Sequence, residues 1–149
     1  MNPTTTSRRH FLGSSAAATA ALSFPTVLRG QAADKEFRVA MIGCGGRCSG
    51  AADQNLSVTG PNTKLVAMAD MFQGNLKGAL GQLKNKHGNK VDVPDERQFV
   101  GFDAFEKVLA MPDVNLVILA TPPGFRPFHF EAAVKAGKHV FMEKPVCTD

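Results

Sequence analysis

The chain has 149 residues, which is enough for one domain and short for two. Its 44% hydrophobic and 20% charged residues are typical of a soluble globular protein and argue against a disordered chain. Three of its 17 Lys and Arg residues lie within residues 1–32, so the remainder carries 14 bases against 13 acids, and this even balance predicts no nucleic-acid partner.

Residues 1–32 have the layout of a signal peptide, with a charged start, an apolar middle and small residues at the end. The start contains Arg8 and Arg9 and resembles the twin-arginine export signal, while Gly30 and Ala32 fit a cleavage site after Ala32. An ordinary amino-terminal helix would explain neither the paired arginines nor the lack of acids. The apolar stretch is rich in alanine and shorter than the roughly 20 strongly apolar residues of a membrane span. We therefore expect a periplasmic or secreted protein with no stable membrane anchor.

Apolar runs and helix-compatible segments alternate along the rest of the chain. Strands are predicted at residues 37–42, 65–69, 98–100, 114–120 and 139–142. Helices are predicted at residues 46–57, 71–88, 103–110 and 126–136. This alternation predicts an α/β fold in which right-handed crossovers build a doubly wound parallel sheet. The polar stretch NKHGNKVDVPDERQ, residues 85–98, is predicted to be an exposed connection.

A glycine-rich turn, Gly43-Cys44-Gly45-Gly46-Arg47-Cys48, follows the first predicted strand. In the dinucleotide fingerprint the first glycine allows a tight turn, the second lets the backbone approach a pyrophosphate, and the third lets the helix pack closely. Only the third glycine is replaced here, by Cys48, and a small side chain is compatible with a packing role. Arg47 places a cation near the phosphates, and the following helix would aim N–H groups at them. By itself this turn is also compatible with an ordinary glycine-rich loop.

The three cysteines, Cys44, Cys48 and Cys147, form neither a disulfide framework nor a complete zinc ligand set. We interpret Cys44 and Cys48 as small, semi-apolar residues rather than as metal or redox groups. No metal site is predicted.

Asp70 ends the second predicted strand, 22 positions after Cys48. The fingerprint expects an acid about 20 residues past the loop, where it accepts hydrogen bonds from the ribose 2′-hydroxyl. An acid at this position favours NAD, because it would repel the 2′-phosphate of NADP. Asp70 could also cap the helix that follows, and the two roles are compatible.

Two further motifs lie where later strands end, which is the edge at which open α/β sheets bind ligands. Thr121, Pro122 and Pro123 follow the fourth predicted strand, and the proline pair holds the chain extended. His129 lies on the next helix, either in the pocket or as a surface or capping histidine.

The second of these motifs, Glu143-Lys144-Pro145, follows the fifth predicted strand. Lys144 could bind a substrate hydroxyl or lower the pKa of a reacting alcohol. It could equally form a structural ion pair with Glu143.

The order GCGGR, VAMAD, ILATPP and GKHVFMEKP resembles the cofactor domain of the Gfo/Idh/MocA oxidoreductases over residues 36–149. The Glu-Lys-Pro element is the most diagnostic part of the resemblance. The resemblance implies an NAD(P)-binding Rossmann domain at residues 33–149, with NAD favoured and NADP also accommodated, and with Lys144 as a catalytic residue near the nicotinamide and the substrate. The implied cofactor-binding residues are Gly43, Cys44, Gly45, Gly46, Arg47, Cys48, Asp70, Thr121, Pro122, Pro123, His129, Glu143 and Lys144.

The family also has a sixth strand and a second domain that supplies most of the substrate pocket. The chain ends before both, so we expect a fragment that binds a dinucleotide without turnover. For the full-length protein the resemblance implies a homo-oligomer that transfers a hydride on a sugar, cyclitol or related polyol. Two alternatives are an NAD-dependent glycosidase on the same scaffold and a non-catalytic dinucleotide-binding module.

Overall fold

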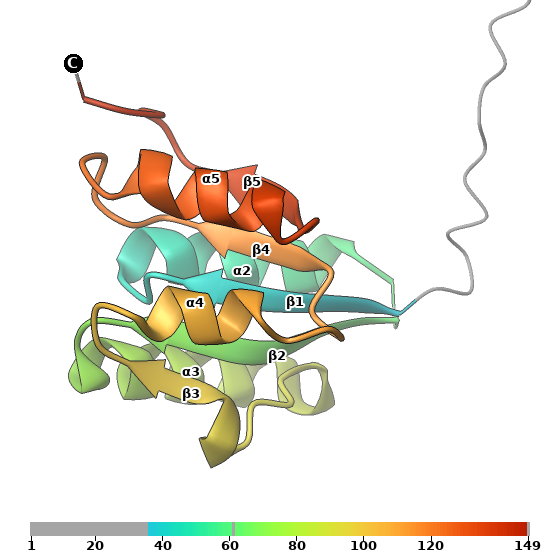
Figure 1. Ribbon diagram of the computed structural model, residues 1–149. Helices are drawn as coiled ribbons and strands as arrows, with labels where there is room; N and C mark the ends of the chain where they lie inside the picture. Colours follow the sequence, from blue (N-terminus) through green and yellow to red (C-terminus); the bar gives the residue numbers. More distant parts are fainter. Residues whose placement is uncertain (1–35, 61, 149) are drawn as a thin grey trace, which may run out of the picture. The chain divides into compact units, whose positions relative to one another are not determined.

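A computed structural model describes residues 36–60 and 62–148, and the predicted signal peptide lies outside them. Its five strands form one parallel sheet in the order β3-β2-β1-β4-β5 (Figure 1). The strands are β1 Phe37–Ile42, β2 Thr63–Asp70, β3 Gln98–Val100, β4 Leu116–Leu119 and β5 His139–Met142. The predicted α/β fold with a doubly wound parallel sheet is confirmed.

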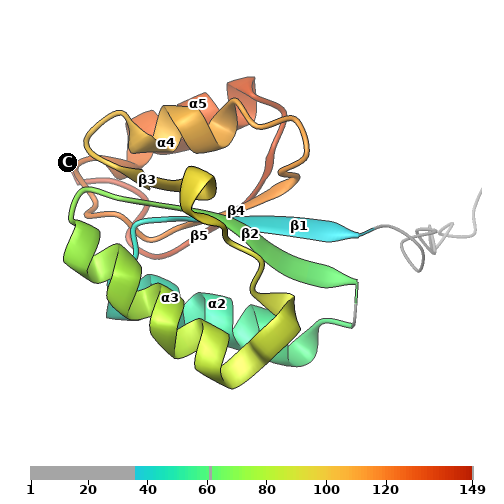
Figure 2. The same cartoon turned by 90° about the horizontal axis from the view of Figure 1, so that it is seen from below.

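Two helices cover each face of the sheet, as Figure 2 shows from the side. α2 (Gly46–Val58) and α3 (Gln73–His87) pack on one face, and α4 (Ala104–Leu109) and α5 (Arg126–Lys135) pack on the other. Each pair encloses its own apolar layer, because alternate residues of the central strands point to opposite faces. No helix in the described ranges combines the length and apolarity that crossing a membrane requires.

The stretch 85–98 is not the wholly exposed connection that its polarity predicts. Two short 3₁₀ turns, η1 (Gly88–Lys90) and η2 (Asp95–Arg97), flank Val91 and Val93, which are only 4% and 8% exposed. Val91 forms a parallel bridge with Leu65, and both valines join the apolar layer under α3. Their spacing of two residues sends both side chains to the same side of an extended chain, and the surrounding charges obscure this pattern in the sequence.

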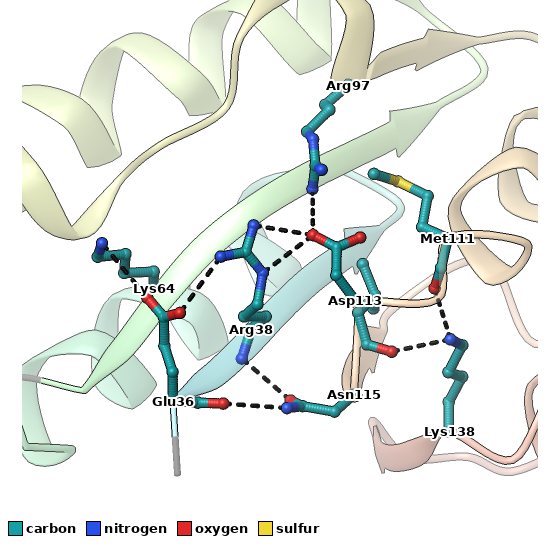
Figure 3. A network of polar contacts seen from close by, with 9 residues as sticks. Glu36, Arg38, Lys64, Arg97, Met111, Asp113, Asn115 and Lys138 are labelled. Atoms are coloured by element: carbon teal, nitrogen blue, oxygen red, sulfur yellow. Dashed lines mark hydrogen bonds and ion pairs between the residues drawn. The ribbon is translucent and has the colours of Figure 1, made fainter. Parts of the chain in front are cut away.

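A polar network joins the amino ends of β1 and β4 (Figure 3). The Oδ2 atom of Asp113 accepts hydrogen bonds from Arg38 Nε at 3.0 Å and from Arg97 Nη1 at 2.8 Å. The side chain of Asn115 accepts from the Arg38 backbone N–H at 3.0 Å and so ties the start of β4 to β1. These contacts stabilise the amino edge of the sheet and leave the carboxyl edge for other groups.

Candidate functional site

A cleft of about 720 Å³ lies at the carboxyl edge of the sheet. The loops after β1, β2, β3, β4 and β5 all contribute to its walls. The structure brings nine of the predicted site residues together there: Gly43, Gly45, Arg47, Asp70, Thr121, Pro122, His129, Glu143 and Lys144. Four others do not line the cleft: Cys44, Gly46, Cys48 and Pro123.

The glycine loop has the backbone geometry that close approach of a ligand requires. Gly43 has φ +90°, and a Cβ atom at this position would lie 3.1 Å from Thr121 Cγ2 and 3.2 Å from the Thr121 backbone nitrogen. A Cβ atom on Gly45 would meet nothing within 4 Å, so this residue faces open space. Gly45 is also the N-cap of α2 and provides no side-chain hydrogen bond to the helix. The first N–H groups of α2 therefore remain available to an anion in the cleft.

The two cysteines of the loop face the apolar core. Cys44 is 3% exposed and Cys48 is 0% exposed, and both belong to the layer beneath α2 and α3. Burial raises the pKa of both thiols, that of Cys48 to about 12. Any contact of these two residues with a cofactor would therefore come from their backbone. Within residues 36–60 and 62–148, no three His, Cys, Asp or Glu side chains are grouped so as to hold a metal ion.

Asp70 is a buried carboxylate that connects the glycine loop to the start of α3. Its Oδ2 atom accepts a hydrogen bond from the Cys44 backbone N–H at 2.5 Å. Its Oδ1 atom accepts from the Phe72 backbone N–H at 2.7 Å and from Asn75 Nδ2 at 3.3 Å. The N-cap of α3 is Phe72, so the prediction that Asp70 caps this helix is wrong. Asp70 instead accepts the hydrogen bond of the N-cap residue and so supports the turn that precedes the helix. A carboxylate can accept about four hydrogen bonds, which leaves Asp70 capacity for a ribose hydroxyl.

The cation of the loop, Arg47, forms an ion pair across the cleft with Glu143. Arg47 Nη2 lies 2.7 Å from Glu143 Oε1, and the Glu143 side chain is 9% exposed. The hydrogen bond from Arg47 is the main cause that holds the pKa of Glu143 below its ordinary value. The structure records no ion pair between Glu143 and Lys144, although the nearby charge of Lys144 also contributes to lowering the pKa of Glu143. Lys144 stays exposed on the cleft wall beside this pair.

His129 lies in the cleft rather than on the outer surface of α5, and this decides between its two interpretations. Its Nδ1 atom lies 3.1 Å from Thr121 Oγ1, and its ring centroid lies 4.3 Å from that of Phe105. Burial lowers the pKa of the imidazole and so favours its neutral form. A neutral ring that contacts Thr121 helps to hold the end of β4 in place.

The sequence interpretation missed two groups of cleft residues. One is Arg126, which is only 4% exposed although it begins a surface helix. The other is a set of phenylalanines in the loops after β2, β3 and β4 and in the helices α4 and α5: Phe72, Phe102, Phe105, Phe125 and Phe128. These rings make much of the cleft wall apolar.

The fold and the cleft define a nucleotide-binding α/β domain, with loops, a helix amino terminus and an acid in the arrangement that dinucleotides require. Residues 37–149 match the family described as "Oxidoreductase family, NAD-binding Rossmann fold", the Gfo/Idh/MocA family. The chain belongs to this family, and the resemblance inferred from its motifs is confirmed.

Individual relatives fall into two groups. A glycosyl hydrolase family 109 protein of Streptomyces coelicolor is 32% identical over 93% of this chain, and an alpha-N-acetylgalactosaminidase of Tannerella forsythia is 33% identical over 70%. The chain spans only 30% and 21% of the lengths of these two proteins. Among solved structures, scyllo-inositol dehydrogenase of Lactobacillus casei with bound NAD(H) and scyllo-inositol has a TM-score of 0.58 and 27% identity, covering 77% of this chain and 30% of that chain. A 3-ketoreductase of Actinomadura kijaniata, in complex with TDP-benzene and NADP, has a TM-score of 0.57 and 27% identity, covering 77% of this chain and 32% of that chain.

Proposed function

We propose that this chain is the NAD(P)-binding part of an exported oxidoreductase that acts on a sugar, a cyclitol or a related polyol. The observation that carries the proposal is the convergence of the glycine loop, Asp70 and Lys144 on one cleft at the carboxyl edge of the sheet. The polyol substrate is supported by the scyllo-inositol dehydrogenase among the structural relatives. When bound, the nicotinamide supplies the hydride acceptor or donor for oxidation or reduction at a carbinol carbon.

The residues of the cleft fit such a cofactor in three places. The amino terminus of α2 offers backbone N–H groups to the pyrophosphate, and Gly45 leaves room for it. The fourth acceptor site of the Asp70 carboxylate accepts a ribose hydroxyl. The ammonium group of Lys144 would donate a hydrogen bond to the substrate oxygen and stabilise the negative charge that develops there when a base removes the hydroxyl proton.

A second function is supported by the relatives that are glycosidases. Five of the curated relatives are glycosyl hydrolase family 109 proteins or an alpha-N-acetylgalactosaminidase. The same cleft would then serve a transient oxidation, and the hydride would return to the sugar after the glycosidic bond breaks. An assay of the full-length protein distinguishes the two reactions, because the oxidoreductase accumulates NADH and the glycosidase releases sugar without accumulating NADH.

The test of the cofactor assignment is a fluorescence titration with NADH and NADPH. The chain contains no Trp and no Tyr, so protein emission does not overlap that of reduced nicotinamide. Asp70→Ala should weaken NADH binding by roughly 10- to 150-fold, because a charge-assisted hydrogen bond contributes about 1.5–3 kcal/mol. NADPH binding should weaken much less, so the preference for NADH narrows. Asp70→Asn keeps a carbonyl acceptor for the loop and should give the same change in preference.

Asp95→Ala is the matched control, because Asp95 is an exposed acid on η2 and does not line the cleft. Equal loss of NADH and NADPH affinity in Asp70→Ala would show that the ribose assignment is wrong. If the unaltered chain binds neither nucleotide, the proposed function itself is wrong.

We also propose that residues 1–32 direct export to the periplasm or beyond the cell, and that the full-length protein is a homo-oligomer. The paired arginines support the first proposal. The second rests on the family resemblance alone.

A further inference from the structure

Arg126 is a buried arginine at the first position of α5, and all its hydrogen bonds go to backbone carbonyl groups. Its Nε and Nη2 atoms donate to the Thr121 carbonyl oxygen at 3.0 and 2.5 Å. Its Nη1 atom donates to the Glu143 carbonyl oxygen at 2.6 Å and also to the Pro145 carbonyl oxygen. One guanidinium group therefore joins the segment after β4 to the segment after β5.

Burying the charged guanidinium of Arg126 costs free energy, and the hydrogen bonds to the carbonyl groups offset this cost only while their geometry is kept. No ion pair within the described residues involves Arg126, so carbonyl dipoles alone compensate its charge. The four bonds use most of the five N–H donors of the planar guanidinium. A lysine has one nitrogen on a flexible stem and cannot reproduce this fork.

Two of the three carbonyl groups that Arg126 binds belong to Glu143 and Pro145, the residues on either side of Lys144. Regular pairing of β4 with β5 ends at Leu119 and Met142, followed by one more bond from the Glu143 N–H to the Leu119 carbonyl oxygen. Beyond that bond, Arg126 connects the two segments. Its contacts with the carbonyl groups of Glu143 and Pro145, the residues on either side of Lys144, hold this segment against the Thr121 wall of the cleft.

We propose that Arg126 is a positioning residue that sets the place of Lys144 at the nicotinamide end of the cleft. It acts through the backbone on either side of Lys144 and not through contact with the reacting atoms. The inference rests on the proposed function, because it assumes that a dinucleotide occupies the cleft.

The test compares NADH with ADP-ribose, which keeps the adenosine, both phosphates and the second ribose of the cofactor but has no nicotinamide ring. In Arg126→Lys, ADP-ribose affinity by calorimetry should stay within about twofold of the unaltered chain. NADH affinity should fall about tenfold, and the change in nicotinamide emission on binding should be lost. Arg97→Lys is the matched control. Arg97 also donates a side-chain hydrogen bond, to Asp113 Oδ2, but it lies at the amino edge of the sheet, away from the cleft.

A double-mutant cycle tests whether Arg126 acts through Lys144. Lys144→Ala should produce the same loss of NADH affinity as Arg126→Lys, and the double variant should lose no more than either single variant. Additive losses would overturn the inference, and so would an unchanged emission signal in Arg126→Lys. A parallel fall in ADP-ribose affinity would show a general structural role instead.

A measurement on the unaltered chain covers the case in which Arg126 variants do not fold. The Arg126 Nε–H resonance, followed by ¹⁵N NMR, should shift on addition of NADH and stay unchanged with ADP-ribose. Equal responses to both ligands, or no response to either, would overturn the inference. If the unaltered chain binds ADP-ribose but not NADH, the inference fails while the adenosine half of the proposed site stands. If it binds neither ligand, the proposed function fails as well.

Discussion

Cys48 occupies the third position of the glycine fingerprint, and its surroundings explain why a thiol fits there. Its side chain is fully buried between α2 and the sheet, with Sγ 3.7 Å from the carbonyl oxygen of Ile118. A ligand in the cleft does not meet this side chain, because the third position serves the packing of helix on strand. The interpretation of Cys44 and Cys48 as small packing residues agrees with this burial.

Thiol reactivity provides a direct check at the scale of single residues. At pH 8 a chromogenic aromatic disulfide should react quickly with Cys147 alone, because it is the only exposed thiol of the three in the chain. The thiolate is the reactive form, and burial, which raises the pKa of Cys48 to about 12, leaves on the order of 10⁻⁴ of this group ionised. All three thiols should react in denaturant. Cys147→Ser should abolish the fast phase, and rapid reaction of a second thiol in the folded chain would contradict the burial.

Gly43 determines the direction in which the chain turns from β1 into α2. Its effect therefore extends to the placement of the whole helix. Its φ of +90° is rarely adopted by other residues, and the Thr121 backbone fills the space where a Cβ atom would be. The strand end, the loop and the helix start are therefore held in one geometry. Gly78 lies in the middle of α3, where a Cβ atom would meet nothing within 4 Å.

These two glycines predict opposite effects of the same substitution. Gly43→Ala should lower the free energy of unfolding by about 1–3 kcal/mol, because the backbone conformation is strained for alanine. Gly78→Ala should raise it by up to about 1 kcal/mol, because alanine favours a helix interior. Urea unfolding followed by circular dichroism measures both changes. If the Gly43→Ala variant is as stable as the unaltered chain, the loop does not require glycine at position 43.

The elements were predictable to the extent that their apolar pattern is local. The predicted strand 37–42 matches β1, and the predicted strand 139–142 matches β5. Val91 and Val93 escaped prediction because only two residues face the core there, amid charges that face solvent. The residues of the Arg47–Glu143 ion pair are 96 positions apart, so no local pattern could indicate it.

At the scale of the whole described domain, the cleft follows from the order of the strands. β1 is central, and the chain winds first toward β2 and β3 and then, from the other side of β1, toward β4 and β5. The loops after β1 and β4 therefore diverge, and a crevice opens at this topological switch point. The family's sixth strand and second domain stay a prediction for this protein, as does the oligomeric state.

Export is tested on the full chain, since residues 1–32 lie outside the described structure. In a Gram-negative host the protein should appear in the periplasm with its first residue near Ala33. Replacing both Arg8 and Arg9 with lysine should retain the unprocessed protein in the cytoplasm. Cell fractionation and mass spectrometry of the amino terminus measure the two outcomes. Normal processing of the lysine variant would contradict a twin-arginine route.

The sequence by itself determined the α/β class, the order of the elements and the family, because glycines, apolar runs and strand-end motifs are local signals. It also indicated which loops meet, since the carboxyl ends of parallel strands share one edge. Only the tertiary structure decided which side chains, far apart in the sequence, contact one another at that edge. Glu143 pairs with Arg47, Lys144 is exposed, and buried Arg126 joins the segment after β4 to the segment after β5. These pairings depend on distances between loops, which only the packed sheet and helices define.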